Sequence, residues 1–186
     1  MARTLLASGC VSPQEIEFEL NAHGKPAVIS PVAAKRPFNI AHTEGLVVFA
    51  SCDQGHIGVD VERISRDTDV ALAKRYFAES EVEFVMSQSS DEERRLAFLR
   101  VWTLKESFIK AIGKGLAIPL ADFAFEQIES HSPCVRILND AWNDGSEWQF
   151  ACVSPAEGYL ASVALTNVPE GKPMEVRLRD FRSRVG

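Results

Sequence analysis

The sequence has no surplus of positive charge and no long apolar run. Its 186 residues include 20 Lys and Arg against 26 Asp and Glu, which gives a net charge of -6 at pH 7. This balance argues against general nucleic-acid binding, which normally needs a basic surface. No stretch has the length and apolar content of a transmembrane helix. We therefore expect neither nucleic acid nor a membrane as a partner.

Cysteine is also scarce, and the cysteines stand apart from one another. None has the paired spacing of a zinc site, so we expect free thiols in a reducing compartment. This prediction favours a cytoplasmic protein. The four cysteines are Cys10, Cys52, Cys134 and Cys152.

What the chain does have is enough apolar residues for a substantial core, because 46% of its residues are hydrophobic. Alternating patterns predict strands and 3.6-residue periodicity predicts helices. Strands are expected near 16–20, 38–42, 46–51 and 57–62 in the first half, and near 123–128, 134–138, 148–153 and 159–165 in the last third. Helices are expected at 69–78, at 80–87 and from the capping box at 90–93 to Gly113. The order β, α, β suggests two similar lobes.

The end of the long helix combines strong apolar character with charge. The segment Trp102–Gly115 reads WTLKESFIKAIGKG, with apolar residues on nearly every side, so it should be buried. It also carries Lys105, Glu106 and Lys110. Because Lys and Glu are seldom buried without partners, we expect these charges to meet other charges.

A candidate partner is the strand Gly58–Glu62. Strand alternation puts Asp60 and Glu62 on one face, with their Cα atoms about 7 Å apart. Their carboxylate oxygens can therefore converge on one ion, and Glu106 from a facing helix can supply a third carboxylate. Three oxygen ligands without His or Cys favour magnesium, which also binds substrate phosphates.

Each pattern alone also has a reading without function. An Asp-x-Glu pair that ends a strand is often a solvated edge. The helix can be a buried element whose Lys105 and Lys110 extend outward while Glu106 pairs with Lys110. The two patterns together are harder to explain as structure alone.

The two motifs give the chain a resemblance to the 4'-phosphopantetheinyl transferases, of the two-lobed monomeric type similar to the surfactin-synthetase activator. The family's strand motif, Gly-aliphatic-Asp-aliphatic-Glu, occurs at Gly58–Glu62. Its helix motif, Trp-x-x-Lys-Glu-(Ser/Ala)-x-x-Lys-x-x-Gly, occurs at Trp102–Gly113. Supporting segments follow the family order at 24–26, 38–43 and 75–81.

The resemblance implies an α+β fold of two lobes related by a pseudo-twofold axis, each a small β-sheet packed on a long helix. We place the first lobe at residues 1–66 and the helical middle and second lobe at 67–186, with the ligand cleft between them. The family's members of this type also imply a monomer.

The implied activity is transfer of the 4'-phosphopantetheine arm of coenzyme A to a serine of an apo acyl or peptidyl carrier protein, with release of adenosine 3',5'-bisphosphate. The carrier would belong to fatty acid, polyketide or nonribosomal peptide synthesis. Magnesium held by Asp60, Glu62 and Glu106 would bind the diphosphate. Glu106 is the expected general base, acting directly or through a metal-bound water.

The resemblance also assigns residues around coenzyme A. Lys110 lies one helical turn beyond Glu106, where it can pair with a metal-site carboxylate or stabilise the departing phosphate, and we favour the second role. The family further implies that Lys25 and His42 contact the phosphates of coenzyme A and that Lys105 assists at the same site. Pro26 would lie against the adenine.

Two departures from the family motivate an alternative. Ala41 stands where family members usually have a serine. The chain also resembles the family only from partway through the first lobe, without the basic segment that holds the ribose 3'-phosphate. The alternative is therefore a non-catalytic, N-terminally truncated remnant that binds a carrier protein or a nucleotide.

Overall fold

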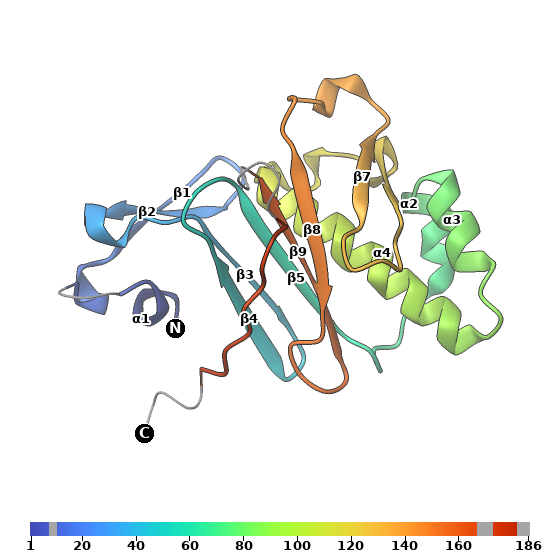
Figure 1. The fold of residues 1–186 in the computed structure, drawn as a ribbon, viewed down its shortest axis with the longest axis horizontal. Coiled ribbons are helices and arrows are strands. Elements are labelled where there is room, and N and C mark those ends of the chain that lie inside the picture. The colour runs from blue at the N-terminus through green and yellow to red at the C-terminus, as the bar shows by residue number, and fades with distance from the viewer. Residues whose placement is uncertain (8–10, 167–172, 182–186) are drawn as a thin grey trace.

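The centre of the molecule is a three-stranded antiparallel sheet with a long helix packed on one face (Figure 1). The computed structural model describes residues 1–7, 11–166 and 173–181. The sheet has the strand order β5-β9-β8, from Ile57–Arg63, Tyr159–Thr166 and Trp148–Val153. The long helix is α4, Asp91–Ile112, and it lies against both β5 and β9.

Helix α4 begins and ends where the sequence predicts. Ser90 Oγ accepts a hydrogen bond from the Glu93 backbone N–H at 3.1 Å, and the Glu93 carboxylate accepts one from the Ser90 backbone N–H at 3.2 Å. This capping box pairs two backbone donors that the first turn would leave unsatisfied. Gly113 ends the helix with φ +76°, a conformation that glycine adopts without steric cost.

Smaller elements surround this centre. In the part of the chain that the structure describes, the two-stranded antiparallel sheets are β1-β2 (Glu17–Leu20, Pro26–Ser30), β3-β4 (Phe38–Thr43, Leu46–Ser51) and β6-β7 (Phe123–Glu126, Cys134–Ile137). The short α-helices are α1 (Ala2–Leu6), α2 (Ala73–Tyr76) and α3 (Glu79–Met86). Strand β3 runs beside the free edge of β5, where Asn39 Oδ1 accepts a hydrogen bond from the Val59 backbone N–H at 2.9 Å.

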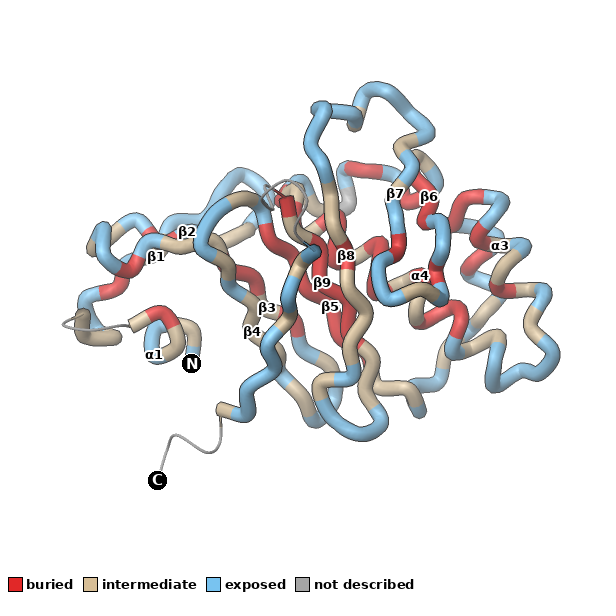
Figure 2. The backbone as a smooth tube through the Cα atoms, in the orientation of Figure 1, coloured by how far each residue is buried: buried red, intermediate tan, exposed pale blue. Residues whose placement is uncertain are grey.

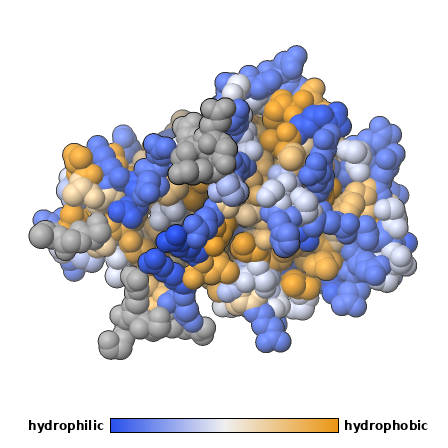
Figure 3. All heavy atoms as spheres, in the orientation of Figure 1, coloured by the Kyte–Doolittle hydropathy of each residue, from blue (hydrophilic) through white to orange (hydrophobic). Residues whose placement is uncertain are grey.

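The two faces of β5 meet two different environments. Val59 and Val61 pack with Ala41 and with residues of β9 in one apolar cluster on the side of β3 and β4. The larger cluster surrounds α4 and includes Phe108 and Phe123. Figure 2 shows that buried residues concentrate along α4 and the central sheet. On the face drawn in Figure 3, hydrophilic residues cover much of the surface, with smaller hydrophobic areas among them. Because side chains alternate along a strand, the face of β5 opposite Val59 and Val61 carries Gly58, Asp60 and Glu62.

The predicted α+β class is confirmed, with small sheets and a long helix. In the described part of residues 1–66, α1 is the only α-helix. Strand β5 pairs with β9 from Ile57↔Leu165 to Arg63↔Tyr159, so the central sheet takes strands from both sides of the predicted lobe boundary at 66/67. The division into two lobes stays a prediction.

Two further expectations concern helices and thiols. Among the described residues, no helix has both the length and the apolar character needed to cross a membrane. Cys52, Cys134 and Cys152 are free, as predicted, and Cys10 lies outside the described residues.

Candidate active site

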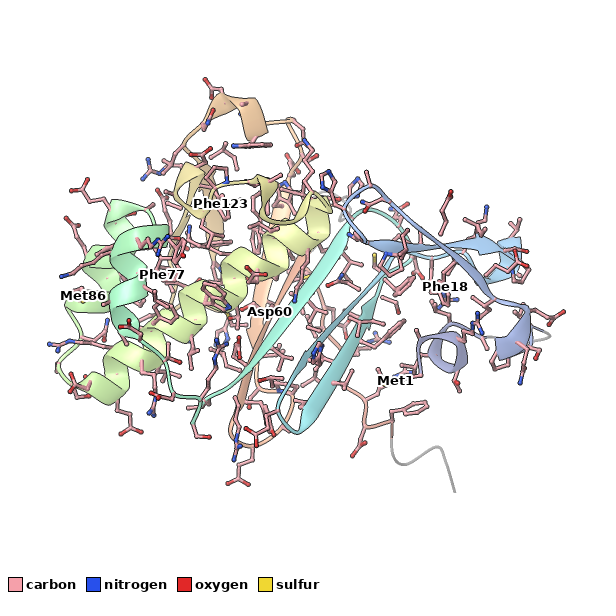
Figure 4. All side chains as sticks on the ribbon, turned by 180° about the vertical axis from the view of Figure 1, so that it is seen from behind. Met1, Phe18, Asp60, Phe77, Met86 and Phe123 are labelled. Carbon is pink, nitrogen blue, oxygen red and sulfur yellow. The ribbon has the colours of Figure 1, made fainter. Side chains whose placement is uncertain are left out.

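The candidate site forms where β5 runs closely alongside α4. A β-carbon at Gly58 would overlap the carbonyl oxygen of Ser107 and the backbone nitrogen of Ala111. Glycine at this position therefore permits the close approach of strand and helix. The next residue on the same face of β5 is Asp60, which Figure 4 shows beside α4.

Asp60 carries a buried carboxylate that the protein only half satisfies. Its side chain is 9% exposed, and its Oδ1 accepts a hydrogen bond from Lys110 Nζ at 2.6 Å. Its Oδ2 is buried and has no hydrogen-bond partner among the residues that the structure describes. Desolvation raises the pKa of Asp60 to about 7, against the opposing effect of the Lys110 ammonium, and the charges of Glu106 and Glu62 raise it further.

Glu62 stands two residues further along the same face and is also buried. Arg66, in the turn after β5, donates from Nη1 to Glu62 Oε1. Thr43 Oγ1 on β3 donates to Glu62 Oε2 at 3.4 Å. Both carboxylate oxygens of Glu62 therefore have partners, in contrast to those of Asp60.

Glu106 faces the two strand carboxylates from α4. Burial raises its pKa, the Lys110 ammonium lowers it, and the Glu62 carboxylate raises it again. Three carboxylates thus share a poorly hydrated space with Lys110 and, at its border, Arg66. This agrees with the expectation that Glu106 meets the strand acids. Lys110 adopts the pairing with Asp60, which was one of its two predicted roles.

The carboxylates are not gathered into a ready-made metal site. Within the described ranges, no group of three or more His, Cys, Asp or Glu side chains is arranged to hold a metal ion. Even so, the chemistry of the site fits magnesium. An orphaned buried oxygen on Asp60 and an excess of negative charge are what a hard divalent cation would satisfy.

Lys105 does not join this site, contrary to the expectation from the resemblance. Its side chain is fully buried, and its Nζ lies 2.7 Å from Glu81 Oε2. It also donates to the backbone carbonyls of Leu120 at 2.8 Å and Phe123 at 2.7 Å. The physical reason is helix geometry: successive residues project about 100° apart, so Lys105 and Glu106 face different neighbours.

Glu81 is a residue that sequence reasoning missed. It is fully buried and accepts hydrogen bonds from the backbone N–H groups of Ala78 at 3.0 Å and Phe125 at 2.9 Å. Burial raises the pKa of Glu81 and lowers that of Lys105, while the attraction between them opposes both shifts. The sequence did contain a signal for this residue, because Glu81 is the last residue of the segment 75–81, which follows the family order.

Lys25 and Pro26 lie near the other end of the β5–α4 contact. Both line a cavity of about 390 Å³, together with Lys35, Arg36 and His56. Lys25 Nζ donates to the backbone carbonyls of Ile57 at 3.1 Å and Ala111 at 2.8 Å. Burial lowers the pKa of Lys25 to about 8.

His42 is placed differently from the other predicted residues. Its side chain is exposed, and strand alternation puts it on the opposite face of β3 from Thr43, which contacts Glu62. The structure therefore brings together Asp60, Glu62, Glu106 and Lys110, whereas His42 has no hydrogen bond or ion pair with any of them among the described residues.

Comparison with known proteins decides the family. Residues 56–164, more than half of the chain, match the 4'-phosphopantetheinyl transferase superfamily. The chain belongs to this superfamily. The match includes the four residues that the site brings together, whereas Lys25, Pro26 and His42 lie before it.

Curated relatives of the superfamily support the same assignment. The chain is 35% identical over 130 residues to the 4'-phosphopantetheinyl transferase Sfp of Bacillus subtilis, covering 64% of this chain and 56% of that protein. It is 35% identical over 119 residues to the gsp transferase of Aneurinibacillus migulanus, covering 64% and 47%. The chain therefore spans about half the length of the curated relatives it matches.

Solved structures of holo-[acyl-carrier-protein] synthases align with part of the chain. The Helicobacter pylori synthase in complex with coenzyme A aligns with a TM-score of 0.48 and 15% identity, over 60% of this chain and 99% of that one. The Thermotoga maritima synthase aligns with a TM-score of 0.47 and 22% identity, over 60% and 62%.

Proposed function

We propose that this chain transfers the 4'-phosphopantetheine arm of coenzyme A to a serine of an apo carrier protein. The observation that carries the proposal is the buried carboxylate of Asp60, which faces Glu106 and Lys110 inside the segment that matches the superfamily. The names of the curated relatives, which are 4'-phosphopantetheinyl transferases, support the same reaction.

The reaction joins the serine oxygen to the phosphorus of the phosphopantetheine group and breaks the diphosphate linkage. Glu106 takes the serine proton, directly or through a water. Burial supports this role, since the raised pKa makes Glu106 a stronger base than an exposed glutamate. Lys110, which pairs with Asp60 and acts electrostatically on Glu106, stabilises the negative charge that develops on adenosine 3',5'-bisphosphate as it departs.

We propose magnesium as the resident cation, with Asp60, Glu62 and Glu106 as the residues that would hold it. The unpartnered Asp60 oxygen and the mutual repulsion of the carboxylates support this assignment. When bound, magnesium would neutralise the diphosphate oxygens and orient them.

The cavity beside Lys25 is the proposed site for the nucleotide end of coenzyme A. Its wall combines the apolar Pro26 and Phe38 with the basic side chains of Lys35 and Arg36, a composition that suits a base with attached phosphates. Ile57 of β5 also lines the cavity, and Asp60 follows about 10 Å further along the strand. A nucleotide in this cavity is thus within reach of the acidic residues.

Several finer statements stay predictions. These are the cytoplasmic location, the monomeric state and the carrier's pathway in fatty acid, polyketide or nonribosomal peptide synthesis. Phosphate contacts by His42 also stay a prediction.

The test is intact-mass analysis of apo carrier proteins incubated with the chain, coenzyme A and magnesium. The proposal expects the added mass of the phosphopantetheine arm on the carrier, and its loss on chelation of the metal. A folded chain that modifies no carrier in a panel of acyl and peptidyl carriers would instead favour the non-catalytic alternative.

A further inference from the structure

The turn after β5 holds a cation against one of the proposed metal ligands. Arg66 Nη1 donates to Glu62 Oε1, and the two residues belong to one five-residue segment of the chain. The Arg66 side chain is 49% exposed, whereas that of Glu62 is 11% exposed. Arg66 therefore reaches in from the surface to a carboxylate that is nearly buried.

The carboxylates of Asp60 and Glu62 differ in how many of their oxygens already have hydrogen-bond partners. Asp60 pairs with Lys110 through Oδ1, and among the described residues its Oδ2 has no partner, so that oxygen can bind a metal ion without breaking the pair. On Glu62, Arg66 occupies Oε1, and the Thr43 hydroxyl reaches Oε2 only at 3.4 Å, near the limit of a hydrogen bond. The guanidinium of Arg66 thus neutralises Glu62, whereas Oδ2 of Asp60 has no hydrogen-bond partner among the described residues.

We propose that Arg66 is a built-in competitor of the divalent cation at Glu62. If the cation uses Oε1, Arg66 must first release that oxygen. If it uses Oε2, the guanidinium charge stays close to the cation and repels it. Both routes act in the same direction, so Arg66 weakens metal binding, while without metal it offsets the charge of Glu62. This inference rests on the magnesium site of the proposed function.

A matched control lies in the same segment. Arg63 Nη1 pairs with Glu44 Oε2 at 3.1 Å, and the Glu44 side chain is 82% exposed. Arg63→Gln and Arg66→Gln therefore remove the same charge three residues apart, but only Arg66 contacts the acidic cluster. Arg66→Lys keeps the charge at the site.

The experiment measures Mn²⁺ binding to the metal-free full chain by electron paramagnetic resonance of free Mn²⁺, without coenzyme A or carrier. Thermal unfolding checks that each variant is folded, and half-exposed Arg66 is not expected to be essential for folding. We expect Arg66→Gln to bind Mn²⁺ about fivefold more tightly than the natural chain. A partly exposed ion pair is typically worth up to the free energy that corresponds to this change in the dissociation constant. Arg63→Gln and Arg66→Lys should stay within about twofold of the natural chain.

Unchanged or weaker binding by Arg66→Gln overturns the inference, and weaker binding means that Arg66 instead orients Glu62 for the metal. Asp60→Asn separates this failure from a failure of the proposed site. If Asp60→Asn weakens Mn²⁺ binding but Arg66→Gln does not strengthen it, the metal site stands and only the role of Arg66 falls. If natural chain, Asp60→Asn and Arg66→Gln all bind alike, both fall together.

Discussion

Glu106 and Lys105 are neighbours in sequence but lie in different electrostatic environments. Glu106 faces the carboxylates of β5, and Lys105 is enclosed with Glu81 on another side of α4. Figure 4 shows Phe77 and Phe123 on that other flank of the helix, away from Asp60, and the rings of both lie near Lys105 Nζ. We therefore expect substitutions at Glu106 and at Lys105 to have different effects, the first on activity and the second on stability.

Replacing Glu106 with Gln should remove transfer while leaving the fold intact. The amide keeps the shape of the side chain but cannot accept the serine proton, so we expect a rate loss of about 10²-fold or more. Intact-mass time courses on a carrier measure the rate, and thermal unfolding measures the fold. Glu92→Gln, on the exposed first turn of the same helix, is the control that should retain full activity. Comparable rates in the two variants would refute the role of Glu106.

Replacing Lys105 with Met should destabilise the protein strongly. It leaves Glu81 buried without its cation, which costs about 3–5 kcal/mol in the free energy of unfolding. Adding Glu81→Leu removes the uncompensated acid and should recover much of that loss. Urea unfolding of both variants measures the effect.

The control for Lys105 is an exposed ion pair. Arg136 Nε lies 2.6 Å from Glu126 Oε1 with both side chains about half exposed, and Arg136→Met should cost about 1 kcal/mol or less. If Lys105→Met and Arg136→Met lose the same free energy of unfolding, the buried pair contributes no more to stability than the exposed one.

At the scale of elements, the contact between β5 and α4 sets the geometry of the site. Gly58→Ala should force the strand away from the helix, because its β-carbon would overlap Ser107 and Ala111. We expect a loss of about 2 kcal/mol or more in the free energy of unfolding. Transfer should also fall, because Asp60 and Glu106 move apart. A variant with natural stability and activity, measured by urea unfolding and intact mass, would show that this close approach is not required.

The elements themselves could be predicted well from local patterns. The strand at 46–51 and the strand at 148–153 have the predicted bounds, and the capping box marks the start of α4. Strand β2 was missed because it begins with Pro26, a residue that weakens a strand signal. The predicted helix 69–78 divides into a 3-10 turn at Val70–Leu72 and α2, where local capping by Asp69 competes with a continuous helix.

The candidate site could be predicted in part. Strand alternation correctly put Asp60 and Glu62 on one face, and the rule that buried charges need partners correctly led to Glu106 as the facing carboxylate. The partner of Lys105 could not be found this way, since Glu81 lies 24 residues earlier and only tertiary packing brings the two together. Arg66 was missed for a related reason: its contact with Glu62 depends on how the turn after β5 folds.

At the scale of the whole molecule, the central sheet joins distant parts of the chain. The pairing of β5 with β9 links residues about 100 positions apart, and no local pattern specifies such a pairing. The acidic site therefore exists only in the folded protein, and a metal ion that binds there should stabilise the whole fold.

Magnesium should accordingly raise the thermal midpoint of the natural chain. At ten times its dissociation constant, a ligand specific to the folded state adds about 1.4 kcal/mol, or about 4 °C for a chain of this size. Differential scanning fluorimetry with and without magnesium measures the shift, and Asp60→Asn is the control in which it should disappear. An equal shift in both proteins would place the binding elsewhere.

We propose that the acidic face of β5 and α4 transfers phosphopantetheine. The most direct test of this proposal is the mass of an apo carrier protein after incubation with the chain, coenzyme A and magnesium, run in parallel with Glu106→Gln. We expect the carrier to gain the phosphopantetheine arm with the natural chain. It should gain nothing with Glu106→Gln or after chelation of the metal. A carrier modified equally by the natural chain and by Glu106→Gln would contradict it.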